Sequence, residues 1–351
     1  MILASATRES IAGVMNVTIW RRLWACFHRT PGARNVWQTI ELTACPTCAL
    51  LRDMRFPSML APGSRVALVA PAGPLRDERD LEHALENTRA MGWEPVVGSY
   101  VLERDGYLAG SDDHRLADIN RFAADASIDG IWCIRGGYGA MRLLDRLDFD
   151  AWRRHPKTLI GYSDITAVHA AIGVHAELVT YHGPTARGQL TDFTRTSLRA
   201  AVVDGSESCG RAHDVITLCG GRVRGRLAGG NLALVASLCG TPYAPSLDGA
   251  ILVLEDVNET VYRIDRMLTQ LRLSGALGRV AGIAFGHFTD VPDEPANEQR
   301  PLADLLRDVA RRCDVPCLAN IPLGHIADQW TIPLGAFAEL DADAGTIQIE
   351  R

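Results

Sequence analysis

The sequence is poor in lysine and has no long apolar run. Lys157 is the single lysine among 36 basic residues, so arginine supplies nearly all of the positive charge. We attribute this bias to the source genome, because the two residue types serve equally well at most surface positions. The formal net charge of -6 argues against a general polyanion-binding protein. No stretch approaches 18 consecutive apolar residues, which argues against a membrane-spanning helix.

The cysteine pattern is not that of a disulfide framework. The nine cysteines are odd in number, several stand in apolar runs, and a chain of 351 residues with 47% hydrophobic residues can bury its cores without cross-links. We therefore expect a reducing, cytoplasmic environment. Cys45 and Cys48 have the spacing of half a zinc knuckle or of a redox pair, but no second Cys or His pair stands nearby. We expect neither a metal nor a redox role for them.

Residues 1–58 differ from the rest of the chain. They carry seven Arg against three acidic residues and show no clear helical or strand period. Arg21 and Arg22 interrupt the best apolar run, so the segment does not resemble a secretory signal. We expect it to lie outside the fold, as a disordered tail or as sequence upstream of a misassigned start. Met54 and Met59, just before the first ordered-looking segment, favour the second interpretation.

Strand and helix patterns alternate over residues 59–184. Apolar runs at 65–70, 130–134 and 158–162 predict buried parallel strands, and helical spacing follows at 80–91, from 113 onward and after Ser163. This alternation predicts a parallel sheet covered by helices. Ligands bind at the carboxyl ends of the strands in such sheets, which is where residues 135–139 and Ser163 are expected.

The second half has a different pattern. Residues 185–222 are polar and predict a linker region, whereas 223–351 predicts a second α/β domain that is richer in short strands. Its expected strands lie at 249–254 and 280–285, and its expected helices at 231–238, 261–274 and 302–313. The whole chain is therefore predicted to be an α/β protein.

Ser163 is the first candidate for a catalytic residue. It stands at a predicted strand-to-helix junction, where a hydroxyl projects from the sheet edge and the first helical N–H groups are free to stabilise an oxyanion. The spacing is not the full Gly-x-Ser-x-Gly pattern, because Ile165 and Thr166 follow. An alternative is that Ser163 is only the N-cap of this helix.

A nucleophilic serine needs a base and an orienting group. His182, His287 and His325 each stand in a loop or at a strand end, and a histidine taken singly in such a place is more often packed or solvated than catalytic. Glu255 ends a buried apolar run, where a carboxylate needs a partner. That partner is a histidine if the role is catalytic, and a salt-bridge cation if the role is structural.

Several ordered motifs together resemble one known family. They are Arg135-Gly-Gly-Tyr-Gly139, Gly161-Tyr-Ser-Asp-Ile-Thr166, Tyr181-His-Gly-Pro184, Gly229-Gly-Asn-Leu232, Leu254-Glu-Asp-Val257 with Tyr262-Arg-Ile-Asp-Arg266, and Pro322-Leu-Gly-His325. Between about residues 60 and 345, the chain resembles the LD-carboxypeptidases, the muramoyltetrapeptide carboxypeptidases of a serine-peptidase family. The resemblance implies a flavodoxin-like or glutamine-amidotransferase-like N-terminal domain followed by a C-terminal domain that carries the acid and the base.

The resemblance also implies a mechanism. Ser163 matches the nucleophile, Glu255 the acid and His325 the base, with the backbone N–H groups of Gly136 and Asp164 as the oxyanion hole. The implied reaction releases the terminal D-alanine from a murein tetrapeptide, at an L-to-D bond, during cytoplasmic cell-wall recycling. It requires no metal or other cofactor, and the family suggests a homodimer. We expect a murein peptide as the partner and neither nucleic acid nor membrane.

A carboxypeptidase must recognise a free carboxylate, which favours an arginine fork. Arg135, Arg263 and Arg266 are candidates, with Tyr262 beside them; the alternative is surface or interdomain pairing.

Two other functions stay open at this point. A microcin C immunity-like peptidase that hydrolyses aminoacyl-nucleotides would need an aromatic platform for a purine, and no Trp occurs between Ser163 and Glu255. The other function is that of a non-enzymatic ligand-binding module, because such proteins can also consist of two α/β domains around a cleft.

Overall fold

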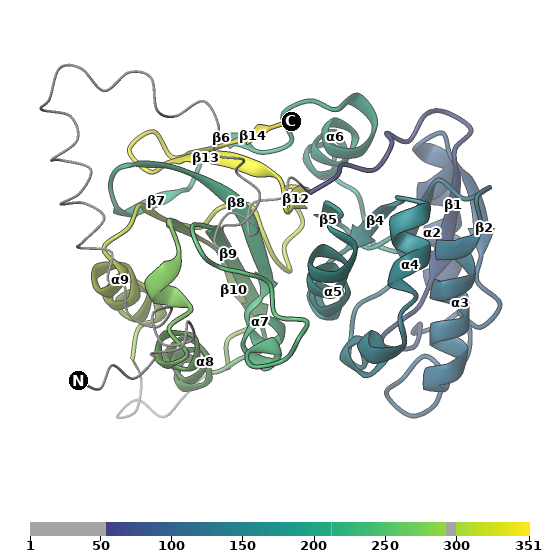
Figure 1. The fold of residues 1–351 in the computed structure, drawn as a ribbon, viewed down its shortest axis with the longest axis horizontal. Coiled ribbons are helices and arrows are strands. Elements are labelled where there is room, and N and C mark those ends of the chain that lie inside the picture. The colour runs from purple at the N-terminus through teal and green to yellow at the C-terminus, as the bar shows by residue number, and fades with distance from the viewer. Residues whose placement is uncertain (1–53, 212, 293–299) are drawn as a thin grey trace, which may run out of the picture. The chain divides into compact units, whose positions relative to one another are not determined.

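The computed structural model describes residues 54–211, 213–292 and 300–351, which belong to one compact unit from Asp53 to Arg351. Cys45 and Cys48, with the predicted tail up to residue 53, lie outside the described residues. Within the described part, two β-sheets form the framework and helices pack against them (Figure 1). The predicted α/β fold, with a parallel-strand sheet and a second sheet of short strands, is confirmed.

The first sheet orders its six described strands β12-β5-β4-β3-β1-β2. Strands β1 to β5 run parallel, and β12 pairs antiparallel with β5. The strands are β1 (Arg65–Val69), β2 (Glu94–Val97), β3 (Gly130–Cys133), β4 (Thr158–Gly161), β5 (Thr180–His182) and β12 (Ile332–Leu334). The helices of this part are α2 (Glu78–Ala90), α3 (Asp112–Ala124), η2 (Ala140–Arg146), α4 (Phe149–Arg154), η3 (Ser163–Ile165), α5 (Thr166–Ala176), α6 (Asp192–Arg199) and η4 (Ala200–Asp204).

Burial on both faces explains the continuous apolar runs of these strands. In β1, Ala67 and Val69 pack into the core cluster that contains residues of α3 and α5. Val66 and Leu68 pack on the opposite face, in a cluster that contains residues of α2. A strand between two helical layers needs apolar side chains at every position, which removes the alternation seen in half-exposed strands.

The second sheet orders its eight described strands β6-β14-β13-β8-β9-β10-β11-β7. Strands β8 to β11 run parallel, and the outer pairs are antiparallel. The strands are β6 (Gly210–Arg211), β7 (Ile216–Cys219), β8 (Arg222–Asn231), β9 (Ile251–Val257), β10 (Gly282–Thr289), β11 (Cys317–Ala319), β13 (Phe337–Asp341) and β14 (Thr346–Glu350). The helices are α7 (Leu232–Leu238), α8 (Val261–Leu273), η5 (Leu277–Arg279) and α9 (Leu302–Cys313).

Three segments differ from the sequence-based expectation. The strand predicted at 249–254 continues to Val257, so Glu255 lies inside β9 rather than after it. Residues 54–58, which the sequence groups with the tail, contact the fold: the Arg55 N–H donates to the Glu177 carbonyl at 2.9 Å. Residues 185–222, predicted as a linker region, contain α6, η4, β6 and β7. The division of the chain at 184 and 223 stays a prediction.

The two sheets meet through α5 and α7, which pack against each other (Figure 1). Leu238 of α7 belongs to the same core cluster as residues of β1, β3 and α5. At the start of α7, the backbone N–H of Asn231 donates to Thr166 Oγ1 at 3.0 Å. Thr166 begins α5 just after Ser163, so this contact joins the end of β8 to the turn that carries the serine. No helix of the described residues is both long and apolar enough to cross a membrane.

Candidate active site

Ser163 lies at the carboxyl end of β4 in a sharp turn. Its φ of 64° places it in the left-handed region, which costs a non-glycine residue roughly 1–2 kcal/mol. The turn separates β4 from η3 and α5, as the strand-to-helix pattern predicts. The N-caps of these two helices are Tyr162 and Ile165, and neither helix has a side-chain cap. Ser163 therefore does not serve as an N-cap, and its partly exposed hydroxyl is left for another role.

Gly136, in the loop after β3, approaches Ser163 closely. A Cβ placed on Gly136 would lie 2.9 Å from the Ser163 Cβ, closer than real Cβ atoms come, and 3.1 Å from the Ser163 Oγ. The N–H of Gly136 makes no hydrogen bond with any described residue. A glycine is therefore required here by space, and it leaves a backbone donor beside the serine hydroxyl.

Asp164 follows the serine and is held by the neighbouring loop. Its Oδ2 accepts a hydrogen bond of 2.7 Å from the Ala140 N–H, which begins η2. Burial raises the pKa of Asp164, although this hydrogen bond opposes the rise. The carboxylate thus fixes the turn, while the N–H of Asp164, second residue of a helix, has no partner within that helix.

Glu255 and His325 form a hydrogen-bonded pair. The imidazole Nδ1–H donates to Glu255 Oε2 at 2.9 Å. Glu255 is fully buried in β9, and its second oxygen has no partner among the described residues. The His325 side chain is 21% exposed. Because an ionised carboxylate only accepts, this contact leaves the Nε2 of a neutral His325 as an acceptor for a proton.

Backbone features of two segments allow this pairing. β10 is irregular between Phe285 and Phe288, and there the His287 N–H donates to the Leu323 carbonyl at 2.8 Å. The loop before His325 is thereby tied to the sheet edge. Gly324 has a φ of 118°, and a Cβ on it would lie 3.0 Å from Glu255 Oε2. The glycine in Pro-Leu-Gly-His is thus needed so that the histidine can reach the buried acid.

Tyr162 connects the serine turn to this pair. Its ring packs against His325 with the centroids 4.8 Å apart. Burial, followed by the charge of Glu255, raises the pKa of Tyr162. The residue next to Ser163 is thus in contact with His325, so both sheets contribute residues to the candidate site. The sequence motif that contains Tyr162 drew attention to Ser163 and gave no signal that the tyrosine ring contacts His325.

The other two candidate histidines have different surroundings. His182 is fully buried, and neither of its ring nitrogens has a partner among the described residues. Burial, then repulsion from His169 and His325, lowers the pKa of His182 well below its usual value. Burial also lowers the pKa of His287, which is partly exposed in β10. Only His325 has a described contact with a carboxylate that is fully buried.

The next residue along β9, Asp256, points the other way. It accepts hydrogen bonds from Asn231 Nδ2 at 2.8 Å and from the Ala233 N–H at 2.9 Å, at the first turn of α7. Burial raises the pKa of Asp256 to about 6. Alternation along a strand therefore places one carboxylate in the site and the next in a helix-capping position.

The arginines proposed from the sequence to bind a carboxylate differ in burial and in their contacts. Arg135 is half-buried beside Gly136 and donates to the Pro74 carbonyl. Tyr262, Arg263 and Arg266 are exposed in the first turns of α8. Arg263 pairs with Glu259 at 3.2 Å, and the Arg266 guanidinium lies 5.3 Å from the centre of the Tyr262 ring. These contacts satisfy the α8 residues locally.

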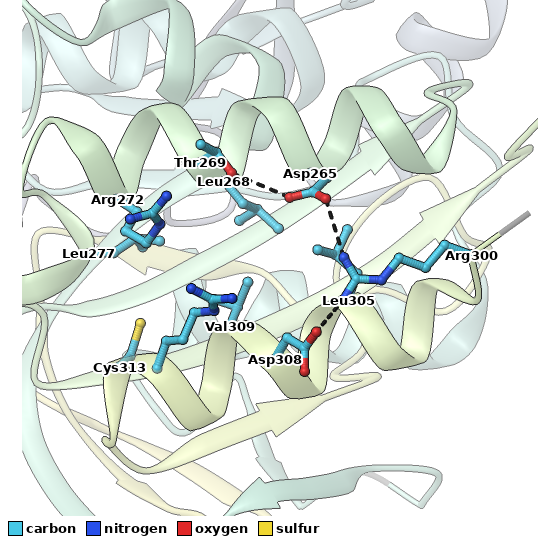
Figure 2. A pocket seen from close by; sticks show the side chains of 11 residues that line it. Asp265, Leu268, Thr269, Arg272, Leu277, Arg300, Leu305, Asp308, Val309 and Cys313 are labelled. Atoms are coloured by element: carbon cyan, nitrogen blue, oxygen red, sulfur yellow. Dashed lines mark hydrogen bonds and ion pairs between the residues drawn. The ribbon is translucent and has the colours of Figure 1, made fainter. Parts of the chain in front are cut away.

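A hollow of about 140 Å³ lies between α8 and α9 (Figure 2). Arg300 bridges it by pairing with Asp265 and Asp308. None of the residues that line it belongs to the predicted site. The described residues also contain no group of three His, Cys, Asp or Glu side chains placed to hold a metal ion.

The sequence matches models of two known domains. Residues 66–183 match the LD-carboxypeptidase N-terminal domain, and residues 224–340 match the LD-carboxypeptidase C-terminal domain. Ser163 falls in the first match, and Glu255 and His325 fall in the second.

Individual relatives agree with these matches. A Streptomyces coelicolor protein named "Putative carboxypeptidase" is 42% identical over 311 residues, which cover 86% of this chain and 98% of the relative. The murein tetrapeptide carboxypeptidase of Pseudomonas aeruginosa is 34% identical over 301 residues, covering 80% and 94%.

Solved structures share the fold. The muramoyltetrapeptide carboxypeptidase from Oxalobacter formigenes superposes with a TM-score of 0.73 at 31% identity, covering 82% of this chain and 98% of that one. The microcin C7 self-immunity protein MccF, in complex with glutamyl sulfamoyl guanosine, superposes with a TM-score of 0.78 at 23% identity, covering 84% and 98%. Together the domain matches and the relatives identify a peptidase, and the chain belongs to the LD-carboxypeptidase family.

Proposed function

We propose that the protein is a serine carboxypeptidase that releases the terminal D-alanine from murein tetrapeptide. The observation that carries the proposal is the 2.9 Å hydrogen bond between His325 and the buried Glu255, beside the ring of Tyr162. The strained turn at Ser163 supports it, because such turns expose a nucleophile at a helix start. The murein tetrapeptide carboxypeptidase relative supports the choice of substrate.

In the proposed reaction, His325 Nε2 accepts the proton of Ser163 as its oxygen attacks the peptide carbonyl. Glu255 stabilises the imidazolium that forms, and its full burial strengthens this interaction. His325 then donates the proton to the departing nitrogen of D-alanine, leaving an acyl-enzyme. Water, activated by the same imidazole, attacks the ester and regenerates Ser163.

The N–H groups of Gly136 and Asp164 are proposed to bind the oxyanion that forms in each half-reaction. Donors of this kind act in the transition state, and loss of one costs about 3 kcal/mol of activation free energy. The chemistry needs no metal. We place the reaction in cytoplasmic cell-wall recycling and expect a homodimer, as the family resemblance implies.

The direct test is release of D-alanine from murein tetrapeptide by the wild type and by Ser163→Ala. We expect the variant to lose D-alanine release while keeping the wild-type melting temperature. Ser206→Ala is a matched control, because Ser206 lies in an exposed turn after η4. Near wild-type activity in Ser163→Ala would remove the serine from the mechanism.

A second candidate function is hydrolysis of aminoacyl-nucleotides, which the fold shared with MccF favours. Its purine would need an aromatic surface, and the absence of Trp between Ser163 and Glu255 argues against one of the expected kind. Incubation with murein tetrapeptide and an aminoacyl sulfamoyl adenosine in parallel separates the two. We expect D-alanine as the product from the first and no cleavage of the second.

A further inference from the structure

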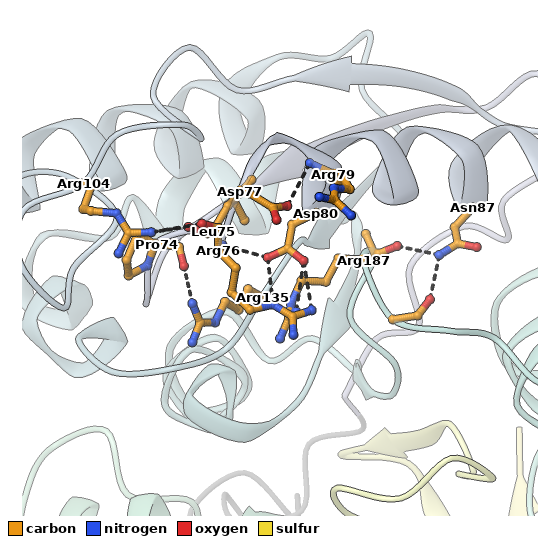
Figure 3. Close-up of polar contacts among 12 residues, drawn as sticks. Pro74, Leu75, Arg76, Asp77, Arg79, Asp80, Asn87, Arg104, Arg135 and Arg187 are labelled. Carbon is orange, nitrogen blue, oxygen red and sulfur yellow. Dashed lines mark hydrogen bonds and ion pairs between the residues drawn. The ribbon is translucent and has the colours of Figure 1, made fainter.

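Four arginines gather at the carboxyl edge of the first sheet. Arg76 follows β1, Arg104 follows β2, Arg135 follows β3 and Arg187 follows β5. We refer to these four residues as the arginine cluster (Figure 3). Ser163 follows β4, the strand between β3 and β5, so loops of the cluster flank the serine turn on both sides.

The cluster contains more positive than negative charge. Asp80 is almost fully buried and accepts from Arg76 and from Arg187, each at 3.1 Å. Burial alone would raise the pKa of Asp80, but the hydrogen bonds and charges of these two arginines hold it below its usual value. Arg104 donates instead to the Leu75 carbonyl at 2.6 Å.

Two members of the cluster have unused capacity to bind an anion. Arg135 donates to the Pro74 carbonyl and has no carboxylate partner among the described residues. Burial, followed by repulsion from Arg187, lowers the pKa of Arg135. The side chain of Arg187 is 21% exposed, yet its buried Nε–H has no described partner. A half-buried guanidinium among other cations is stabilised when an anion binds to it.

Both residues are close to the proposed nucleophile. Arg135 directly precedes Gly136, which contacts Ser163. Arg187 is near enough to Tyr162 for its charge to act on the tyrosine hydroxyl, and its loop is tied to β3 through the Ala186 N–H and the Cys133 carbonyl at 3.0 Å. In a C-terminal residue, the carboxylate carbon lies roughly 4 Å from the attacked carbonyl carbon, so its binding groups must flank the serine.

We propose that Arg135 and Arg187 bind the free C-terminal carboxylate of the peptide substrate. Asp80 acts as the positioning residue: it holds Arg187 and neutralises Arg76 without reaching the substrate. This inference rests on the proposed function and names the groups that make the enzyme a carboxypeptidase rather than an endopeptidase. It also selects among the sequence candidates, because Arg263 pairs with Glu259 just before α8 and Arg266 lies over the Tyr262 ring.

The test compares two substrates in each variant: murein tetrapeptide and the same peptide with its terminal carboxylate converted to an amide. Wild type is expected to prefer the free acid in kcat/KM. Arg135→Gln and Arg187→Gln should each lower kcat/KM for the acid roughly 10- to 100-fold, the range for a lost hydrogen bond to a charged group. Their kcat/KM for the amide should change less than about threefold, because the amide never used the charge.

Arg121→Gln is the matched control. Arg121 is half-exposed on α3 and pairs with Asp118 at 3.5 Å, so its replacement removes one positive charge from the same half of the molecule. It should leave the preference for the acid unchanged. Equal losses on acid and amide in the cluster variants, or no preference in the wild type, would overturn the proposal.

Calorimetry with Ser163→Ala separates this proposal from the proposed reaction. The acid peptide should bind this variant more tightly than the amide, and adding Arg135→Gln should remove the difference. If wild type released no D-alanine but this binding difference persisted, the reaction would be wrong and the carboxylate site would stand. If binding showed no difference, the carboxylate site would be wrong regardless of turnover.

Discussion

The carboxyl edge of the first sheet and the corresponding end of β9 in the second are built in opposite ways. At the first, Ser163 stands on a left-handed turn, partly exposed, with arginines on the neighbouring loops. At the second, Glu255 lies inside β9 and is fully buried. In the proposed mechanism Ser163 is the nucleophile and must reach the substrate, which accounts for the strained backbone there. An acid that stabilises an imidazolium works best when it is desolvated and rigid.

Glu255→Gln tests the buried carboxylate on the second sheet. The amide keeps the shape of the side chain but removes the charge that stabilises the imidazolium, so kcat should fall about 10³- to 10⁴-fold. Steady-state release of D-alanine measures it. Asp256→Asn is the control, because Asp256 faces α7 instead of the site. Asp256→Asn should lower the melting temperature and leave kcat close to the wild-type value. A kcat of Glu255→Gln within tenfold of wild type would contradict the role assigned to Glu255.

Gly136→Ala tests the close approach at the serine side. The added methyl group would lie 2.9 Å from the Ser163 Cβ, so either the serine or the Gly136 N–H must move. We expect kcat to fall about 10²- to 10³-fold, as when an oxyanion donor is displaced. Gly278→Ala, where a Cβ meets no atom within 4 Å, should leave kcat unchanged. Comparable rates for the two variants would rule out a tight fit between Gly136 and the serine.

His169→Gln tests what it costs to bury a histidine that has no carboxylate partner, unlike His325. His169 is buried beneath the serine turn, with Nε2–H donating to the Gly161 carbonyl at 2.8 Å. Burial lowers its pKa from 6.5 to about 4. The folded state therefore binds this proton less readily than the unfolded state. The contribution of neutral His169 to the free energy of unfolding is therefore fully present above pH 6.5. It is lost as the pH falls toward 4, by at most about 3 kcal/mol.

Urea unfolding at pH 7.5 and pH 4.5 measures this loss. His169→Gln should show a smaller drop between the two pH values than wild type. His83→Gln, at an exposed position of α2, should show the wild-type drop. An unchanged drop in His169→Gln would mean that other groups account for the acid sensitivity.

The sequence predicts the fold where the signal is local. Continuous apolar runs mark β1, β3 and β4. The Gly-Tyr-Ser motif marks the turn at Ser163, because the change from strand to helix there is visible within a few neighbouring residues. It also predicts a partner for Glu255, since a carboxylate in an apolar run must find one. The choice between His325 and a salt bridge could not be made from local pattern, because 70 residues separate the pair.

Contacts between distant loops were not predictable in the same way. Arg187 and Asp80 are 107 residues apart, and nothing in their neighbours marks either one. Arg263 and Arg266, by contrast, stand close to Glu255 in the sequence and are exposed in the first turns of α8.

In the proposed mechanism, Ser163 and His325 act as one unit across the two sheets. The kcat/KM values of Ser163→Ala, His325→Ala and the double variant test it most directly. We predict that each single change lowers kcat/KM by at least about 10⁴-fold and that the double variant is no worse than the lower single variant within about threefold. Losses that multiply in the double variant would show that the two residues act independently and would contradict the proposed mechanism.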